Sequence, residues 1–293
     1  MTNREHNSGH SNRPEKPSIL LACKNISRTF AGIEALSDVT LEFPAGRVTA
    51  ILGPNGAGKT TLFNILDGTI APTGGTVLYK DRNITGLAPW KVGRLGIGRL
   101  FQELRLFSNL TALENMLVAD PGLALEGPLA ALTCRRAIGK QRNQVVARSA
   151  ELLTRVGLGN KLHSKAAGLS FGQQKLLAIA RMLAMKPQVV LADEPTAGVH
   201  PEIGDRLIQI LKGLAGTGVA VVVIEHNLDV VHRIADWTYL LAEGRVVAQG
   251  PPAAVLMNPD LIVSLQGSVV SAKGHIWPRN RPVAEPSNLE TFN

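Results

Sequence analysis

The apolar positions of the chain fall into short runs in two blocks, residues 19–102 and 188–250, where strand-like runs alternate with helical stretches. In the first block, the pattern predicts a hairpin after Gly74, a short helix over 90–95 and strands over 19–27, 39–43, 47–52 and 97–101. In the second block, it predicts helices from Pro201 and over 228–236, and strands over 189–192, 219–224, 237–242 and 245–249. Such alternation is typical of an α/β domain.

Between the two blocks the spacing of apolar residues becomes helical. Thr111 and Glu114 have the spacing of a capping box that opens a helix. Helical spacing then continues to about Met185, interrupted by a Pro/Gly-rich stretch over 121–128. We interpret residues 109–186 as a helical insert in one domain that spans 18–267. The polar, aperiodic segments 1–17 and 268–293 are expected to be disordered tails.

A glycine-rich segment lies between the predicted strand 47–52 and a predicted helix over 61–67. Its glycines allow successive backbone N–H groups to point at one anion, and the following helix adds its positive N-terminal end. Lys59 can reach the terminal phosphates, and the Thr60 hydroxyl can bind Mg²⁺. The segment predicts a nucleoside triphosphate site formed by Gly53, Pro54, Asn55, Gly56, Ala57, Gly58, Lys59, Thr60 and Thr61.

Two apolar strands end in polar side chains at what we expect to be the same edge of the sheet. Asp193 and Glu194 follow one strand, and His226 follows another. Asp193 is placed to hold Mg²⁺, and Glu194 to orient or deprotonate the attacking water. His226 can hydrogen-bond the γ-phosphate or that water. Taken alone, a surface Asp-Glu pair and a structural histidine are the alternative interpretations.

A second helix start also has the character of an anion site. Ser170 and Gln173 form a capping box ahead of an apolar helix, with Gly172 between them. Capping is one sufficient explanation of these residues. However, one phosphate loop suffices for one nucleotide, so the second helix end suggests two copies packed head to tail. Each helix would then close over the nucleotide of the other copy.

Composition and charge narrow the function further. Only 4% of the 293 residues are aromatic, which argues against a base-stacking surface. The formal charge is +8, and residues 134–161 hold seven basic residues against one acid. That excess fits a solvated helical face, an anionic membrane surface or nucleic acid. No apolar run is long enough to span a membrane, and the two cysteines form no metal-type pair, so we expect a soluble chain in a reducing cytosol.

The ordered motifs resemble those of the ATP-binding subunits of ABC transporters over about residues 19–267. They are the phosphate loop, the strand-terminal Gln102, LSFGQQ, LADEP and IEHN. Within that family, the aromatic residue in LSFGQQ, the wording around Gln102 and the long basic segment are similar to importers for branched-chain amino acids, amides and urea. The resemblance implies a P-loop, ABC-type α/β ATPase fold with an N-terminal antiparallel β subdomain and a helical insert subdomain.

The resemblance also implies roles in ATP hydrolysis. Lys59 would bind the β- and γ-phosphates, while Thr60, Gln102 and Asp193 would hold Mg²⁺. Glu194 would be the general base, and His226 would sense the γ-phosphate.

Other implied roles concern binding and assembly. Phe30 would stack on adenine, although its sequence context also allows a core or turn aromatic. Ser170, Gly172 and Gln173 would act in trans on the ATP of a second ATPase subunit, identical or paralogous. The Gln102 region and the insert would touch a transmembrane permease at the cytoplasmic side of the inner membrane. An external solute-binding protein is implied indirectly, and no nucleic acid partner is expected.

Two alternatives and two departures from the family pattern stay open. An export-type subunit, as for lipopolysaccharide, and a soluble ATP switch on nucleic acid or ribosomes use the same chemistry.

Most relatives carry Leu-Asp or Leu-Asn where this chain ends its 196–200 loop in Val199-His200. That loop normally couples the two sites of a dimer. Phe171 replaces a flexible glycine, which stiffens the turn.

Overall fold

The computed structural model describes residues 18–120 and 135–256. The two predicted tails and the Pro/Gly-rich interruption of the insert lie outside these ranges. Within the described ranges, no helix combines the length and the apolar character that crossing a membrane requires.

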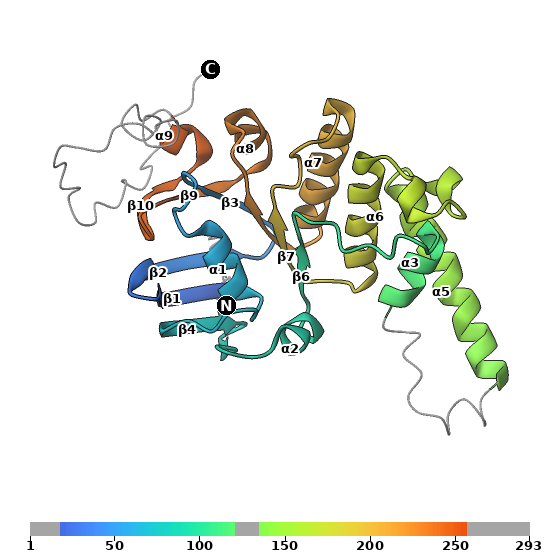
Figure 1. Cartoon of the computed structure of the whole chain (residues 1–293), viewed down its shortest axis with the longest axis horizontal. Coiled ribbons are helices and arrows are strands. Elements are labelled where there is room, and N and C mark those ends of the chain that lie inside the picture. The colour runs from blue at the N-terminus through green and yellow to red at the C-terminus, as the bar shows by residue number, and fades with distance from the viewer. Residues whose placement is uncertain (1–17, 121–134, 257–293) are drawn as a thin grey trace, which may run out of the picture.

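A six-stranded sheet forms the centre of the molecule (Figure 1). Five of its strands are parallel to one another, and the edge strand β10 pairs antiparallel with β9. Every residue of β3, β7 and β8 is buried, because both faces of this sheet are covered. The spatial order is β10 (Arg245–Gly250), β9 (Trp237–Ala242), β3 (Val48–Leu52), β8 (Ala220–Ile224), β7 (Val189–Asp193) and β6 (Ile97–Leu100).

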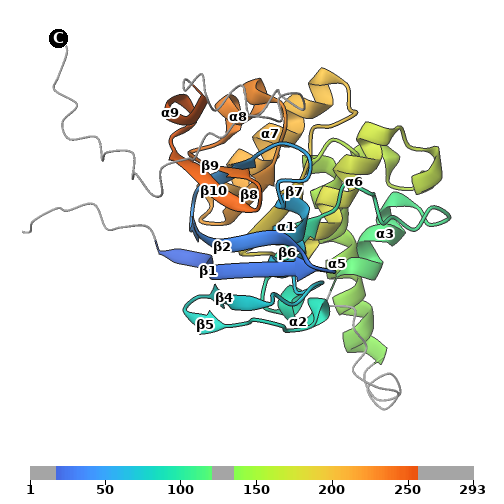
Figure 2. The same ribbon diagram turned by 60° about the vertical axis from the view of Figure 1, so that its left-hand side comes forward.

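A four-stranded antiparallel sheet packs on one side of this centre (Figure 2). Its order is β2 (Ile33–Pro44), β1 (Ile19–Phe30), β4 (Gly74–Tyr79) and β5 (Arg82–Asn83). β1 and β2 are longer than the sequence pattern predicts. In the outer half of β2, Ile33 is exposed whereas the adjacent Leu36 and Ser37 are both buried, so burial does not alternate there. Irregular register near Asn25 and Asp38, both with positive φ, further breaks the pattern.

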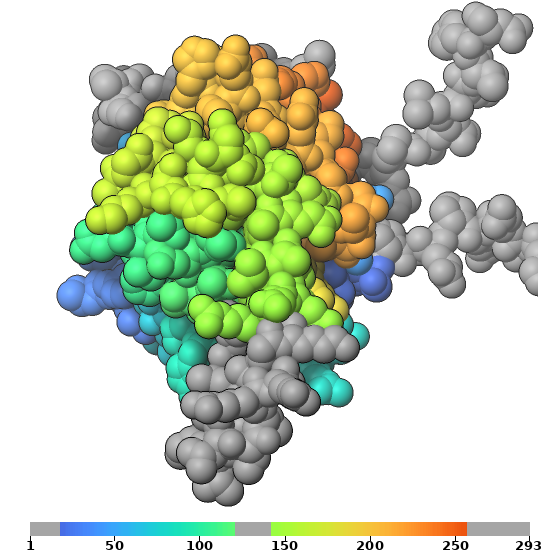
Figure 3. All heavy atoms as spheres, turned by 90° about the vertical axis from the view of Figure 1, so that its right-hand side faces the viewer, coloured from blue at the N-terminus to red at the C-terminus, as the bar shows by residue number. Residues whose placement is uncertain are grey.

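The helices divide between the two sheets and one end of the molecule. Within the region predicted as an insert, α3, α5 and α6 pack together, and Figures 1 and 3 show α3 and α5 forming that end of the molecule. The boundaries of the insert stay a prediction. The helices are α1 (Lys59–Leu66), α2 (Pro89–Arg94), α3 (Ala112–Ala119), α5 (Arg135–Arg155), α6 (Phe171–Ala184), α7 (Pro201–Gly216), α8 (Leu228–Ile234) and α9 (Pro252–Leu256).

Two hydrophobic clusters cover the opposite faces of the six-stranded sheet. Alternate residues of β3 contribute to each: Ala50 joins the cluster with the insert helices, and Ile51 joins the cluster with α1 and the antiparallel sheet. The first cluster also contains Leu153 of α5, and the second contains Phe63 of α1. Because the parallel strands end at one edge, this layered core brings their C-terminal residues together.

Candidate functional site

The phosphate loop connects β3 to α1, as the sequence predicts. Gly58 precedes the helix with φ of 100°, and a Cβ there would lie 2.6 Å from the Ala35 carbonyl oxygen. The first turn of α1 has no side-chain cap, so its N–H groups face the loop interior without a local acceptor from the N-cap residue. This arrangement suits an anion at the helix start.

Lys59 points back into the loop. Its Nζ donates hydrogen bonds to the carbonyl oxygens of Gly53, at 2.7 Å, and Pro54, at 2.8 Å. Burial lowers the pKa of Lys59, while the nearby Glu194 and Asp193 carboxylates oppose that shift. The ammonium group is therefore held beside the acidic end of β7 and within the loop that would receive phosphate.

Asp193 lies at the end of β7 in a buried ion-pair network. Its Oδ2 accepts from Nη2 of Arg99 at 3.3 Å, and Nη1 of Arg99 pairs with Oδ2 of Asp67 at 2.6 Å. Burial raises the pKa of Asp193, and the Arg99 guanidinium opposes that rise. Sequence reasoning missed Arg99. The signal was a charged residue inside a short apolar strand, since such a residue needs a partner in the core.

The three residues predicted to act in hydrolysis converge. Glu194 Oε1 lies 2.6 Å from Nε2 of His226, and Glu194 Oε2 accepts from Nε2 of Gln102 at 3.5 Å. The longer of these two contacts is weak by geometric criteria. Glu194 has φ of 46°, a left-handed conformation that is costly for a non-glycine residue. The fold thus brings the Glu194 side chain together with those of His226 and Gln102 at the C-terminal edge of the parallel strands.

The loop after Glu194 is held by two buried charges that sequence reasoning also missed. Lys175 donates to backbone carbonyls of this loop, and Glu225 accepts hydrogen bonds from the backbone N–H, at 3.2 Å, and the hydroxyl, at 2.8 Å, of Thr196. Burial raises the pKa of Glu225 and lowers the pKa of Lys175. Their signal in the sequence was again a charge among apolar neighbours.

The Ser170 helix end has the predicted capping box. Ser170 Oγ accepts from the Gln173 N–H at 3.3 Å, and Gln173 Oε1 accepts from the Ser170 N–H at 3.1 Å. Gly172 lies against α7, where a Cβ would approach Ile203 at 3.1 Å. Among the hydrogen bonds of the described residues, none joins this helix end to the phosphate loop of the same chain. A phosphate bound at the Ser170 helix end would therefore belong to a nucleotide other than the one in the phosphate loop of this chain.

Phe30 lies at the turn between β1 and β2. Its side chain is 38% exposed, so it is not a core aromatic. The Arg28 guanidinium stands 4.5 Å from the ring centroid. Adenine stacking on this partly exposed ring stays a prediction.

Comparison with known proteins gives a consistent result. A family model described as ABC transporter matches residues 36–197. The chain is 34% identical over 249 residues to the high-affinity branched-chain amino acid transport ATP-binding protein LivG of Salmonella typhimurium, covering 85% of this chain and 98% of that protein. It is 35% identical to the corresponding protein BraF of Pseudomonas aeruginosa over the same shares of both chains.

Solved structures of ATP-binding cassettes have the same fold. A nucleotide-free cassette from an ABC transporter aligns with a TM-score of 0.74 and 32% identity, covering 85% of this chain and 99% of that one. A dimeric cassette in a post-hydrolysis state, bound to ADP and inorganic phosphate, aligns with a TM-score of 0.67 and 30% identity, covering 80% and 99%. Both alignments span nearly the whole of the solved chains, so the likeness covers the complete cassette fold.

Proposed function

The chain belongs to the ABC transporter family and is an ATP-binding, ATP-hydrolysing cassette, and from that premise we propose that it powers uptake of branched-chain amino acids or related amides or urea. The observation that carries the proposal is the 34% identity to a branched-chain amino acid transport subunit over 98% of its length. The relatives named above are all amino acid transport proteins. That agreement favours import over an export-type subunit or a soluble switch on nucleic acid or ribosomes.

In the proposed reaction, the backbone N–H groups of residues 53 and 55–61 bind the phosphates of ATP; Pro54 has no N–H to donate. Lys59 exchanges its two carbonyl partners, Gly53 and Pro54, for oxygens of the β- and γ-phosphates. Glu194 takes a proton from the attacking water, and His226 hydrogen-bonds the γ-phosphate. The 2.6 Å contact between Glu194 and His226 supports these two roles, because it places the proposed base and the proposed γ-phosphate ligand next to each other.

Mg²⁺ fits the donors present at the proposed site. Mg²⁺ prefers oxygen ligands and is usually held by one or two carboxylates together with substrate phosphates. The Thr60 hydroxyl, the Gln102 amide oxygen and the Asp193 carboxylate provide such donors. When bound, the ion would neutralise charge on the phosphates.

The proposed assembly contains further subunits. Ser170, Gly172 and Gln173 bind the ATP of a second ATPase subunit, and Phe30 stacks on adenine. The region after Gln102 and the helical insert contact a transmembrane permease, which places the chain peripherally at the cytoplasmic side of the inner membrane. An external solute-binding protein delivers the solute to that permease.

Membrane co-purification with a tag on this chain tests the assembly. We expect recovery of a polytopic permease, with one or two ATPase subunits. Proteoliposomes made from the complex should take up labelled leucine, isoleucine and valine, or urea and short amides, when the solute-binding protein is present outside and ATP is supplied on the ATPase side. The same complex carrying Glu194→Gln should form but take up nothing. Recovery of ribosomes or nucleic acid without a permease would overturn the proposal.

A further inference from the structure

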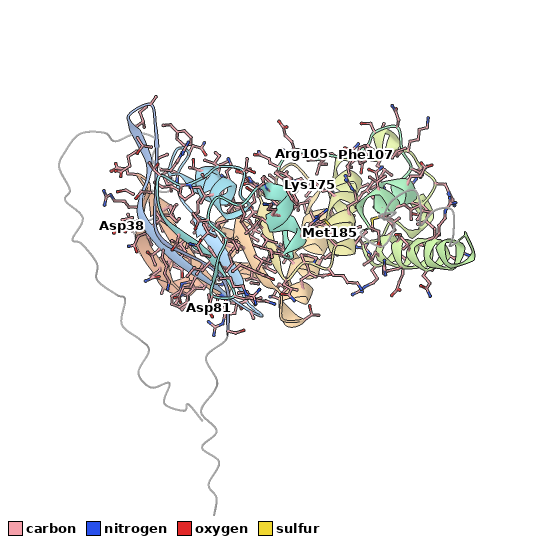
Figure 4. All side chains as sticks on the ribbon, turned by 90° about the horizontal axis from the view of Figure 1, so that it is seen from below. Asp38, Asp81, Arg105, Phe107, Lys175 and Met185 are labelled. Carbon is pink, nitrogen blue, oxygen red and sulfur yellow. The ribbon has the colours of Figure 1, made fainter. Side chains whose placement is uncertain are left out.

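Lys175 is a buried lysine in the second turn of α6, five residues after the helix cap Ser170. Its residue exposure is 3%, and Figure 4 shows it at the junction between the sheets and the helical insert. Its Nζ donates to three backbone carbonyls, those of Glu194 at 3.0 Å, Pro195 at 3.1 Å and Ala197 at 2.7 Å. An ammonium group has three N–H donors, so each of them is used on this one loop.

These hydrogen bonds fix the main chain of Glu194 on both sides of its Cα. The Glu194 N–H donates to the carbonyl oxygen of Ile224 at 3.0 Å, and its carbonyl oxygen accepts from Lys175. A left-handed non-glycine residue persists where its surroundings over-determine it. Lys175 is one of the contacts that do so here, together with the Ala197 N–H, which donates to the same carbonyl oxygen at 3.2 Å, and Lys175 comes from a helix rather than from the sheet.

The same helix start touches the loop at further points. The Phe171 ring lies against Gly198, where an added Cβ would be 3.3 Å from its Cε1 atom, and Gly172 lies against Ile203 in the first turn of α7, just after the loop. From the sheet side, Glu225 holds Thr196. The loop over residues 194–200 is therefore attached to the first turns of α6 as one packed unit. The charges that face Lys175 are the carboxylates of Glu225 and Glu194.

We propose that Lys175 is a positioning residue that transmits the state of the Ser170 helix end to Glu194 of the same subunit. This inference rests on the proposed function in one respect, that Ser170 closes over the ATP of the partner. Closure would displace the start of α6, and Lys175 would carry the Glu194 main chain with it. The two ATP sites are then coupled through backbone carbonyls. This coupling does not need an acidic or amide side chain at position 200, where the chain has His200.

The test is the steady-state ATPase kinetics of the full chain with Lys175→Met. We expect kcat to fall about 100-fold, the effect of a misplacement of about 1 Å at a catalytic group. The cooperativity of hydrolysis in ATP concentration should be lost, while the Kd for a fluorescent ATP analogue changes less than about threefold. Lys175→Arg keeps donors and charge and should recover most of kcat and the cooperativity.

Lys212→Met is the matched control, because Lys212 also donates to a backbone carbonyl, that of Arg233 at 3.1 Å, on the surface away from the site. It should leave every parameter unchanged. Wild-type kcat and cooperativity in Lys175→Met would overturn the inference. So would a loss of nucleotide affinity as large as the loss of kcat, which indicates general damage to the fold.

If Lys175→Met does not fold, Thr196→Val decides the question. This variant removes the Glu225 hydrogen bond to the hydroxyl in the same loop, and a smaller fall in kcat with reduced cooperativity would support the inference. Unchanged kinetics would refute it. Failure of the proposed function looks different: wild type would hydrolyse ATP cooperatively yet import none of the solutes. Normal import together with fully active Lys175→Met would remove only the Lys175 inference.

Discussion

At the residue scale, Glu194 carries the clearest expectation. Glu194→Gln keeps the size and shape of the side chain but replaces the basic carboxylate by a neutral amide. We expect phosphate release to fall by about 10²–10⁴-fold, the usual contribution of a general base, with ATP binding retained. Phosphate release and filter binding measure the two properties separately. Glu151→Gln, on the exposed surface of α5, is the control. Normal turnover in Glu194→Gln would refute the assigned role.

The buried ion pairs of Arg99 give a prediction about stability. The side chains of Arg99, Asp67 and Asp193 are at most 9% exposed, so Arg99→Met leaves two carboxylates buried without their cation. We expect the free energy of unfolding to fall by about 3–5 kcal/mol. Urea denaturation measures it. Arg233→Met breaks a 2.7 Å pair with Asp205 whose side chains are half exposed, and it should cost less than about 1 kcal/mol. Equal, small losses in both variants would contradict the argument.

The residues that sequence reasoning found and those that it missed differ in the range of their contacts. The phosphate loop is predictable because its glycines and Lys59 encode a local backbone shape. Asp193, Glu194 and His226 are predictable because parallel strands end at one edge. Arg99 pairs across 32 and 94 positions of sequence, so no local pattern reveals its partners. Lys175, likewise, binds carbonyls about 20 positions away.

At the element scale, the start of α6 has a matched counterpart in α3. Both helices begin with a complete capping box, at Ser170 and at Thr111. Replacing either residue by arginine should cost about 1 kcal/mol of stability through the lost cap. Only Ser170→Arg should abolish cooperative hydrolysis, since it places a bulky cation where the partner's ATP would bind. ATP binding to the phosphate loop should be unchanged.

Thermal melting and the ATPase assay together separate these two effects. Turnover equal to wild type in Ser170→Arg would refute the role in trans. Loss of turnover in Thr111→Arg would show that loss of a helix cap is enough to stop hydrolysis, without any contact to the ATP of a partner.

The hairpin of β1 and β2 gives a second prediction at this scale. Cys23 is fully buried in β1, and burial raises its pKa to about 12. A raised thiol pKa keeps the neutral form up to high pH, so at pH 8 the reactive thiolate is about a thousandfold rarer than at the ordinary pKa. In a Cys134→Ser variant, we expect no reaction with Ellman's reagent until urea unfolds the sheet. Rapid labelling of the native protein would show that β1 opens.

The same hairpin shows why element lengths were less predictable than element types. The sequence pattern predicts strands over 19–27 and 39–43, whereas the structure continues both to a two-residue turn. In the outer half of β2, burial does not alternate, because Ile33 is exposed whereas the adjacent Leu36 and Ser37 are both buried, and cross-strand pairing continues both strands to the turn. The buried parallel strands, by contrast, were predicted within one or two residues, because burial on both faces makes them continuously apolar.

At the scale of the whole molecule, the catalytic residues and the Ser170 helix end occupy different parts of the chain. Glu194, His226 and Gln102 converge at the strand ends, whereas Ser170 begins a helix that packs with the insert. From this separation we infer that one chain offers half of each of two sites. On that inference, hydrolysis needs a second ATPase subunit, and a solved cassette that is 30% identical to this chain is dimeric with ADP and phosphate bound.

Light scattering on the Glu194→Gln variant tests whether that second subunit is an identical copy. With ATP and Mg²⁺, we expect the mass to double from 31.2 kDa, because both nucleotides stay intact between the two copies. Without nucleotide, the chain should be monomeric because no ATP joins the two copies, and with EDTA it should be monomeric because unneutralised phosphates repel across the interface. Adding Ser170→Arg should also keep it monomeric. A dimer that survives Ser170→Arg would place the interface elsewhere, and a monomer under all conditions would mean that the natural partner is a different ATPase chain.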